Sequence, residues 1–199
     1  MYYFIELSLI PDESVSTGFV MSKVMDVLHL CFVNLQKDVG HNPVGLAFPK
    51  YRYDPDAKGD IKGHLGAQIR LYAQTEAHLE ALNLKQQLRR FEDYVHLRTV
   101  RELDRENFGF ACFKRVQFRS SAERLARRRT HYVDESYEQA LQHFQDFAEQ
   151  QSDLPFVHLH SQSSEQAFRL FIAKQAVDAP TDWKFSSYGL SATVGVPNV

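Results

Sequence analysis

Residues 2–10 read YYFIELSLI and predict the first strand of the fold. Apolar side chains at every second position, with Glu6 and Ser8 between them, have the two-residue period of a half-buried strand. The next apolar side chains recur at three- and four-residue spacing, which is the period of one helix face: Val20, Val24, Val27, Leu28, Cys31 and Leu35. We therefore expect a strand and then a long amphipathic helix that begins after Ser16 or Thr17.

Four more elements are expected before residue 101. Apolar runs at 44–48 and 67–73 predict two strands, and the charged, turn-rich stretch 49–63 between them predicts a loose hairpin loop. A helix is expected over 76–91 and another strand over 94–100. The order β-α-β-β-α-β is that of a ferredoxin-like or RRM-like unit, in which two helices back one antiparallel sheet.

The composition changes after residue 100, because the cations gather there. Between Lys114 and His131 there are seven lysines and arginines and one acidic residue, a local charge of +6. We predict an α+β fold with a ferredoxin-like domain at 1–100 and a second domain at 101–199 that holds an arginine-rich helix and a small antiparallel sheet. The elements expected in this second domain are a helix from Ser120 with a capping box to Glu123, a helix over 135–150, and strands over 156–161 and 168–174.

Composition narrows the class of protein. The chain has 199 residues, of which 44% are hydrophobic, and this is enough to build the core of one large domain or of two small ones. The net charge of -2 argues neither for nor against a polyanionic partner. Cys31 and Cys112 lie in apolar runs, so we expect reduced thiols rather than a disulfide framework. The first ten residues lack a basic start, and no run matches the ~18 uninterrupted apolar residues of a membrane span. We expect a cytoplasmic protein.

The cationic segment favours a polyanion. Arg124, Arg127, Arg128 and His131 have i, i+3, i+4 and i+7 spacing, which predicts one cationic helix face. Like charges at this spacing repel, and arginine pairs with phosphate bidentately, so nucleic acid is the favoured partner. A solvated basic helix is the alternative. The segment 115–117 offers Arg and Gln on one strand face, where they could contact base edges or form an ordinary exposed face.

Other polar residues are weaker candidates by themselves. His29 borders the apolar helix stripe, as many packed or surface histidines do. His158 and His160 share a strand face and could form half of a metal site, but no His or Cys pair with zinc spacing accompanies them. Phe108–Phe113 is similar to part of an RNP1 motif but lacks its basic residue and glycine, so core packing is favoured over base stacking. Ser161–Gln166 by itself predicts a hairpin loop.

Eight segments together carry a resemblance to a known family. They occur in this order along the chain: His29 within Val27–Leu30, Gly45–Pro49, Arg115–Gln117, Glu123–Leu125, Leu154–Val157, Ser161–Ser163, Phe168–Ile172 and Tyr188–Ser191. They resemble the type I-F CRISPR precursor-RNA processing endoribonucleases over almost the whole chain. The resemblance implies that the first half carries the catalytic histidine and that the arginine-rich helix lies in the major groove of a repeat hairpin.

The resemblance also implies roles for individual residues. His29 would be the general base, Ser161 would hold the ribose 2′-hydroxyl, and Tyr188 would orient the imidazole. Arg115 and Gln117 would contact base edges low in the stem, with Phe168 stacked beneath its terminal pair. The remaining side chains assigned to RNA are Lys114, Arg119, Arg124, Arg127, Arg128, Arg129, His131 and Ser163.

The implied reaction suits these residue types. Histidine titrates near neutral pH and can take the proton of a 2′-hydroxyl, which then attacks the adjacent phosphorus. No metal and no cofactor are expected, and the products would be a 2′,3′-cyclic phosphate and a 5′-hydroxyl. The implied partners are the CRISPR repeat RNA hairpin and the other Cas proteins of a type I-F surveillance complex. Two alternatives are a non-cleaving RNA-hairpin-binding module and a metal-dependent nuclease that uses His158, His160 and nearby carboxylates.

Overall fold

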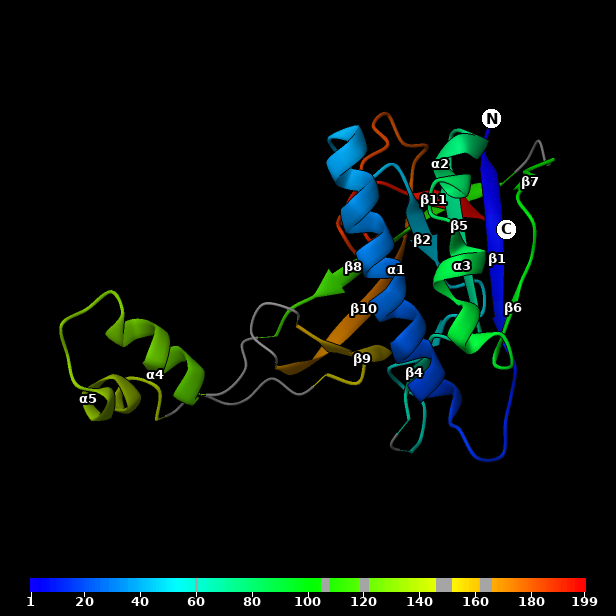
Figure 1. Ribbon diagram of the computed structural model, residues 1–199. Helices are drawn as coiled ribbons and strands as arrows, with labels where there is room; N and C mark the ends of the chain where they lie inside the picture. The colour runs from blue at the N-terminus through cyan, green and yellow to red at the C-terminus, as the bar shows by residue number, and fades with distance from the viewer. Residues whose placement is uncertain (60, 105–107, 119–121, 146–151, 162–165) are drawn as a thin grey trace. The chain divides into compact units, whose positions relative to one another are not determined.

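A computed structural model describes residues 1–59, 61–104, 108–118, 122–145, 152–161 and 166–199 (Figure 1). It is a mixed α/β structure with antiparallel sheets, as the sequence predicts at this level. The chain forms two compact units: one holds Met1–Val116 together with Leu154–Val199, and the other holds Gln117–Asp153. These two units do not coincide with the predicted domains at 1–100 and 101–199. The domain boundary at residue 100 stays a prediction.

One sheet contains the predicted first strand, β1 (Tyr3–Leu9), in its interior. Its strand order is β2-β5-β1-β6, all neighbours are antiparallel, and β7 also pairs with β1. The bounds of the other strands are β2 Gly45–Ala47, β5 Gln68–Ala73, β6 Val95–Leu97 and β7 Arg101–Glu102. Neighbours that are far apart in sequence therefore build the sheet, as a β-α-β-β-α-β order requires.

Glu6 departs from the simple alternation of β1, because it is buried although it was expected on the polar side. Its carboxylate accepts a hydrogen bond from Arg70 Nε at 2.7 Å, and Arg98 Nε lies 3.4 Å away. Arg70 lies directly opposite Glu6 on β5. The buried charge is thus matched by two cations, which is the condition under which a carboxylate is kept inside a protein.

The long helix α1 (Thr17–Val39) forms as predicted. The Ser16 side chain accepts from the Phe19 N–H at its start, and Gly40 in the left-handed conformation ends it. By length and composition α1 could cross a membrane, but its apolar face is part of the core: Val24, Met25, Leu28 and Phe32 are 0% exposed. Cys31 lies on the same face as a free thiol, and burial raises its pKa to about 11.

The predicted helix over 76–91 is interrupted. The structure has α2 (Glu76–Glu80), α3 (Leu84–Gln87) and the 3-10 turn η1 (Arg89–Phe91) in its place. Asn83 adopts a left-handed backbone conformation with φ 45°, which ends the helical path between α2 and α3. The three leucines expected to face inward are nevertheless buried: Leu79, Leu82 and Leu88.

The loop expected over 49–63 contains structure that the sequence analysis missed. Strands β3 (Arg52–Tyr53) and β4 (Gly63–His64) pair as a two-stranded antiparallel sheet. Each strand has two residues, too few to show an apolar period.

A second sheet has the order β11-β8-β10-β9. Its strands are β8 (Gly109–Val116), β9 (Phe156–His160), β10 (Ala167–Val177) and β11 (Val196–Asn198), all paired antiparallel. The rings of Phe108 and Phe110 pack edge-on against Tyr2, with centroids 6.1 and 5.9 Å away. These contacts agree with the core role favoured for this aromatic segment.

The smaller unit contains two short helices, α4 (Ala122–Thr130) and α5 (Tyr137–Gln142), which pack on each other. A capping box between Ser136 and Gln139 starts α5, so the helix expected over 135–150 begins later and ends at Gln142. The capping box expected at Ser120 falls outside the described residues.

Candidate active site

His29 lies in the middle of α1, beside the buried stripe and partly exposed. Its Nδ1 is 2.7 Å from the backbone carbonyl oxygen of Ser187. Because a carbonyl oxygen only accepts, Nδ1 must carry the proton that is donated in this bond. The Nε2 atom of the neutral ring then keeps its lone pair, which is the requirement for a general base.

Tyr188 fixes the plane of the imidazole. The two rings are stacked, with centroids 4.2 Å apart and an interplanar angle of 10°. Tyr188 thus restrains the face of the His29 ring, while the carbonyl of its neighbour Ser187 restrains the ring edge. The orienting role expected for Tyr188 agrees with this geometry, although the role itself stays a prediction.

Asn42, which the sequence analysis did not single out, holds the loop that carries Ser187 and Tyr188. It is 1% exposed, and its side-chain Nδ2 donates to the carbonyl oxygens of Val44 at 3.1 Å and Ser186 at 2.7 Å. Its backbone carbonyl accepts from Phe185 N–H at 3.0 Å. The buried amide therefore ties the segment after α1 to the loop that contacts His29.

Gly189 closes the same loop. Its carbonyl accepts from Leu46 N–H at 2.8 Å, and its φ of +71° lies in the region that favours glycine. A Cβ at this position would meet Leu46 Cβ and Phe32 Cε2, each at 2.9 Å. Only glycine allows the backbone beside Tyr188 to approach the core this closely.

Arg115 and Phe168 form a neighbouring pair. The guanidinium carbon lies 5.5 Å from the centroid of the half-buried Phe168 ring, within the range of a cation–π contact. Burial raises the pKa of Tyr188, and the positive charge of Arg115 opposes that rise. Arg115 is therefore electrostatically coupled to the ring that stacks on His29, which links four of the predicted site residues.

Ser161 directly follows β9, the strand that packs against α1. Its backbone N–H donates to the Gln166 carbonyl at 3.0 Å, which closes the loop between β9 and β10. The side chain is partly buried. Ser163 lies outside the described residues, and the placing of the Ser161 hydroxyl on the same ribose as His29 stays a prediction.

Two other predicted RNA contacts lie near the end of β8. Lys114 Nζ donates at 2.8 Å to Oε1 of Gln175 on the neighbouring strand β10, two residues beyond the register partner of Lys114, Ala173. Gln117 is exposed, as Arg115 is, and lies one residue beyond the end of β8, so its place on the same face as Arg115 stays a prediction. The pairing of β8 with β10 ends at Val116, the residue between Arg115 and Gln117.

The arginine helix is α4, and its cations are not equivalent. Arg127 and Arg128 are exposed, and no carboxylate pairs with them among the residues that the structure describes. Arg129, by contrast, forms an ion pair with Glu135, whose other oxygen is 3.4 Å from His143 Nε2. Arg129 thus has a carboxylate partner in the smaller unit, and its contact with RNA stays a prediction.

The remaining cationic positions are partly described. His131 is exposed and lies one residue beyond α4, in a turn whose His131 N–H donates to the Arg128 carbonyl, and its place on the cationic face stays a prediction. Ala126, in the same helix, is 0% exposed, so an arginine would not fit there. Arg124 lies on α4 but its side chain, like all of Arg119, is outside the described residues.

His158 and His160 occupy the exposed face of β9 and alternate with the buried Val157 and Leu159. Among the described residues, no group of three or more His, Cys, Asp or Glu side chains is placed to hold a metal ion. The alternative that puts a metal on these two histidines therefore lacks a third ligand in this part of the chain.

Comparison with known proteins identifies the family. The family model described as CRISPR-associated protein (Cas_Csy4) matches residues 4–199. A protein of Escherichia coli (strain UTI89 / UPEC), named CRISPR-associated endonuclease Cas6/Csy4, is 32% identical over 198 residues, which cover 99% of each chain. A protein of the same name from Pseudomonas aeruginosa (strain UCBPP-PA14) is 30% identical over 198 residues, also 99% of each chain. As its sequence segments predicted, the chain belongs to the Cas_Csy4 family of CRISPR-associated endonucleases.

Proposed function

We propose that this protein is a metal-independent endoribonuclease that binds a CRISPR repeat hairpin and cuts the RNA at the 3′ base of the stem. The single observation that carries the proposal is the restraint of His29, whose Nδ1–H donates to the Ser187 carbonyl while Tyr188 stacks on the ring. This arrangement directs the proton-accepting Nε2 away from the loop. A histidine held in one tautomer and one plane is suited to general-base catalysis.

In the proposed reaction, His29 Nε2 takes the proton of the ribose 2′-hydroxyl. The 2′-oxygen attacks the adjacent phosphorus, and the bond from phosphorus to the 5′-oxygen of the next nucleotide breaks. That oxygen takes up a proton, so the products are a 2′,3′-cyclic phosphate and a 5′-hydroxyl. Ser161 holds the 2′-hydroxyl in line, and this orientation supplies a large part of the rate enhancement.

The proposed RNA contacts divide between the two units. In the larger unit, Phe168 stacks beneath the terminal base pair, and Arg115 contacts a base edge beside it, which their 5.5 Å contact supports. In the smaller unit, Arg127 and Arg128 contact phosphates of the stem. Because the A-form major groove is deep and narrow, α4 enters it near an end of a short stem.

The finer description of the fold and setting is part of the same proposal. In chain order, the four strands of the predicted β-α-β-β-α-β unit are β1, β2, β5 and β6. Their order across the sheet, β2-β5-β1-β6, supports a ferredoxin-like unit over residues 1–100. We propose that the enzyme works in the cytoplasm, keeps its cleaved RNA, and serves as a subunit of a type I-F surveillance complex. The curated relatives' name, CRISPR-associated endonuclease, supports the CRISPR setting.

One gel tests the proposal against both alternatives. The protein is incubated in EDTA with its repeat RNA, and in parallel with RNA that carries 2′-deoxyribose at the scissile nucleotide. We expect cleavage of the all-ribose RNA alone, with a cyclic phosphate at the new 3′ end. The chemical reason is that the deoxy substrate lacks the attacking oxygen.

Each other result overturns the proposal. Binding without cleavage of the all-ribose RNA identifies a non-cleaving hairpin-binding module. Cleavage that appears only when a divalent metal is restored identifies a metal-dependent nuclease. Cleavage of the deoxy substrate excludes attack by the 2′-oxygen.

A further inference from the structure

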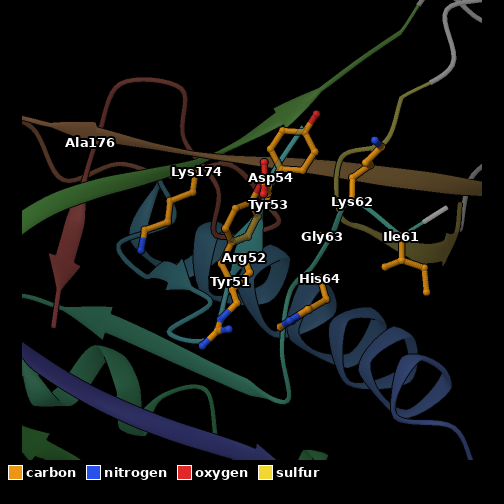
Figure 2. Close-up of a pocket in the computed structure, with 10 residues that line it drawn as sticks. All are labelled: Tyr51, Arg52, Tyr53, Asp54, Ile61, Lys62, Gly63, His64, Lys174 and Ala176. Atoms are coloured by element: carbon orange, nitrogen blue, oxygen red, sulfur yellow. The ribbon is translucent and has the colours of Figure 1, made fainter. Parts of the chain in front are cut away.

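A hollow of about 700 Å³ lies between the β3–β4 hairpin and β10, within the larger unit (Figure 2). Its size is that of small-ligand sites, which range over ~300–1,000 Å³. The hairpin contributes Arg52, Tyr53 and Lys62, and β10 contributes Lys174. Nothing in the proposed cleavage reaction uses these residues.

The lining is cationic and largely unneutralised. The lining contains three cations, Arg52, Lys62 and Lys174, and one carboxylate, that of Asp54. The Asp54 Oδ1 accepts from the Asp56 N–H at 3.0 Å, and Lys62 Nζ donates to the Ala57 carbonyl oxygen at 2.6 Å. Within the described ranges, no ion pair involves any of the three cations. Burial lowers the pKa of Lys174, so its charge is costly where it stands and would be stabilised by an anion.

Aromatic rings accompany the cations. Tyr51 and Tyr53 line the same hollow, and Tyr53 is 37% exposed. Arg52 lies directly opposite His64 in the hairpin register, so both side chains project from one face of the hairpin, and Figure 2 draws both among the residues that line the hollow. Cations beside exposed rings are the composition of surfaces that bind unpaired nucleotides, since the charges hold phosphates and the rings stack on bases.

The hollow is preformed, because the hairpin is fixed to the second sheet. The Tyr51 hydroxyl donates to the Ile172 carbonyl of β10 at 3.1 Å. A Cβ at Gly63 would meet the Arg52 carbonyl oxygen at 2.4 Å and Pro155 Cγ at 3.1 Å, so the hairpin packs as closely as glycine allows. A site that is already formed loses little entropy when it binds.

We propose that this hollow binds unpaired RNA that continues from the repeat hairpin, through its phosphates and one or two bases. The inference rests on the proposed function, in which Phe168 lies beneath the stem. Phe168 and Lys174 are both on β10, six residues and therefore roughly 20 Å apart along the strand. A few unpaired nucleotides span that distance. The pairing of tyrosine rings with cations favours RNA over an acidic peptide.

The test compares two non-cleavable RNAs with 2′-deoxyribose at the scissile nucleotide: the bare hairpin, which keeps only the single nucleotide that follows the scissile phosphate, and the hairpin with longer unpaired flanks. The protein is the full chain, and Kd is measured by fluorescence anisotropy over a range of salt. We expect the flanked RNA to bind about tenfold more tightly. The doubly substituted Arg52→Gln/Lys174→Met should lose this gain and lower the salt slope by roughly 1.4, which is ~0.7 for each of two phosphate contacts. RNAs with only the 5′ or only the 3′ flank then show which side occupies the hollow.

A matched control removes two cations elsewhere on the larger unit. Lys37→Met/Arg90→Gln has the same charge change at exposed positions outside the hollow and should keep the full gain. Cleavage of the bare all-ribose hairpin by the pocket variant shows that it is folded. The inference is overturned if the flanked RNA binds no more tightly than the bare hairpin, which is the result expected of a peptide-binding site. It is also overturned if the pocket variant and the control variant lose the added affinity equally. Failure of the proposed function is separate, since bare-hairpin cleavage by the unsubstituted protein would then be absent.

Discussion

Replacing His29 by alanine is expected to lower the single-turnover cleavage rate by about 10³-fold, since general-base catalysis contributes ~10²–10⁴-fold. The affinity for the hairpin should stay the same, because the ring contacts the Ser187 carbonyl and Tyr188 rather than the cationic residues assigned to RNA. Cleavage and binding are measured separately, by gel and by anisotropy with a 2′-deoxy substrate.

His96→Ala is the matched control for this variant. His96 is exposed on β6 and has no assigned role, so its substitution should change neither rate nor affinity. A His29→Ala protein that cleaves at the normal rate, or that no longer binds the hairpin, would contradict the role given to His29.

Substitution of Gly189 by alanine should damage both stability and cleavage. A side chain at φ +71° is strained, and the added Cβ would press on Leu46 and Phe32 at 2.9 Å. A left-handed residue costs roughly 1–2 kcal/mol and overpacking about 1–3 kcal/mol, so the free energy of unfolding should fall by about 2–5 kcal/mol. The displaced Tyr188 would release His29, so the cleavage rate should fall as well. Urea unfolding and single-turnover cleavage measure the two effects.

Gly18→Ala controls for the added methyl group. Gly18 lies in the first turn of α1, and a Cβ there would have no neighbouring atom within 4 Å, so alanine should raise the free energy of unfolding by about 0.5–1 kcal/mol. A Gly189→Ala protein as stable and active as the unsubstituted chain would show that the close packing beside Tyr188 is not required.

The elements with strong periodicity were predictable from sequence. The alternation in residues 2–10 and the spaced apolar residues from Val20 to Leu35 each follow from one buried face, and β1 and α1 have nearly the predicted bounds. The 76–91 segment was predicted as one helix because its leucines keep helical spacing. A single left-handed Asn83 interrupts it, and asparagine carries too weak a local signal to show this.

The site was predictable only in part, for a different physical reason. The resemblance selected His29 and Tyr188, and the structure stacks them although they lie far apart in sequence. Asn42 was missed because its function depends on hydrogen bonds to Ser186 and Phe185, and long-range backbone partners leave no pattern in a sequence. The ion pair between Arg129 and Glu135 was missed likewise, since it depends on the turn between α4 and α5.

The central claim is that His29 and Ser161 act on the same ribose 2′-hydroxyl, and a double-mutant cycle tests it most directly. Single-turnover cleavage rates are measured for His29→Ala, Ser161→Ala and the protein with both substitutions. Groups that act as a unit are strongly non-additive, so the double variant should be no slower than His29→Ala alone. Losses that multiply, so that Ser161→Ala slows the His29→Ala protein as much as it slows the unsubstituted one, would contradict the claim.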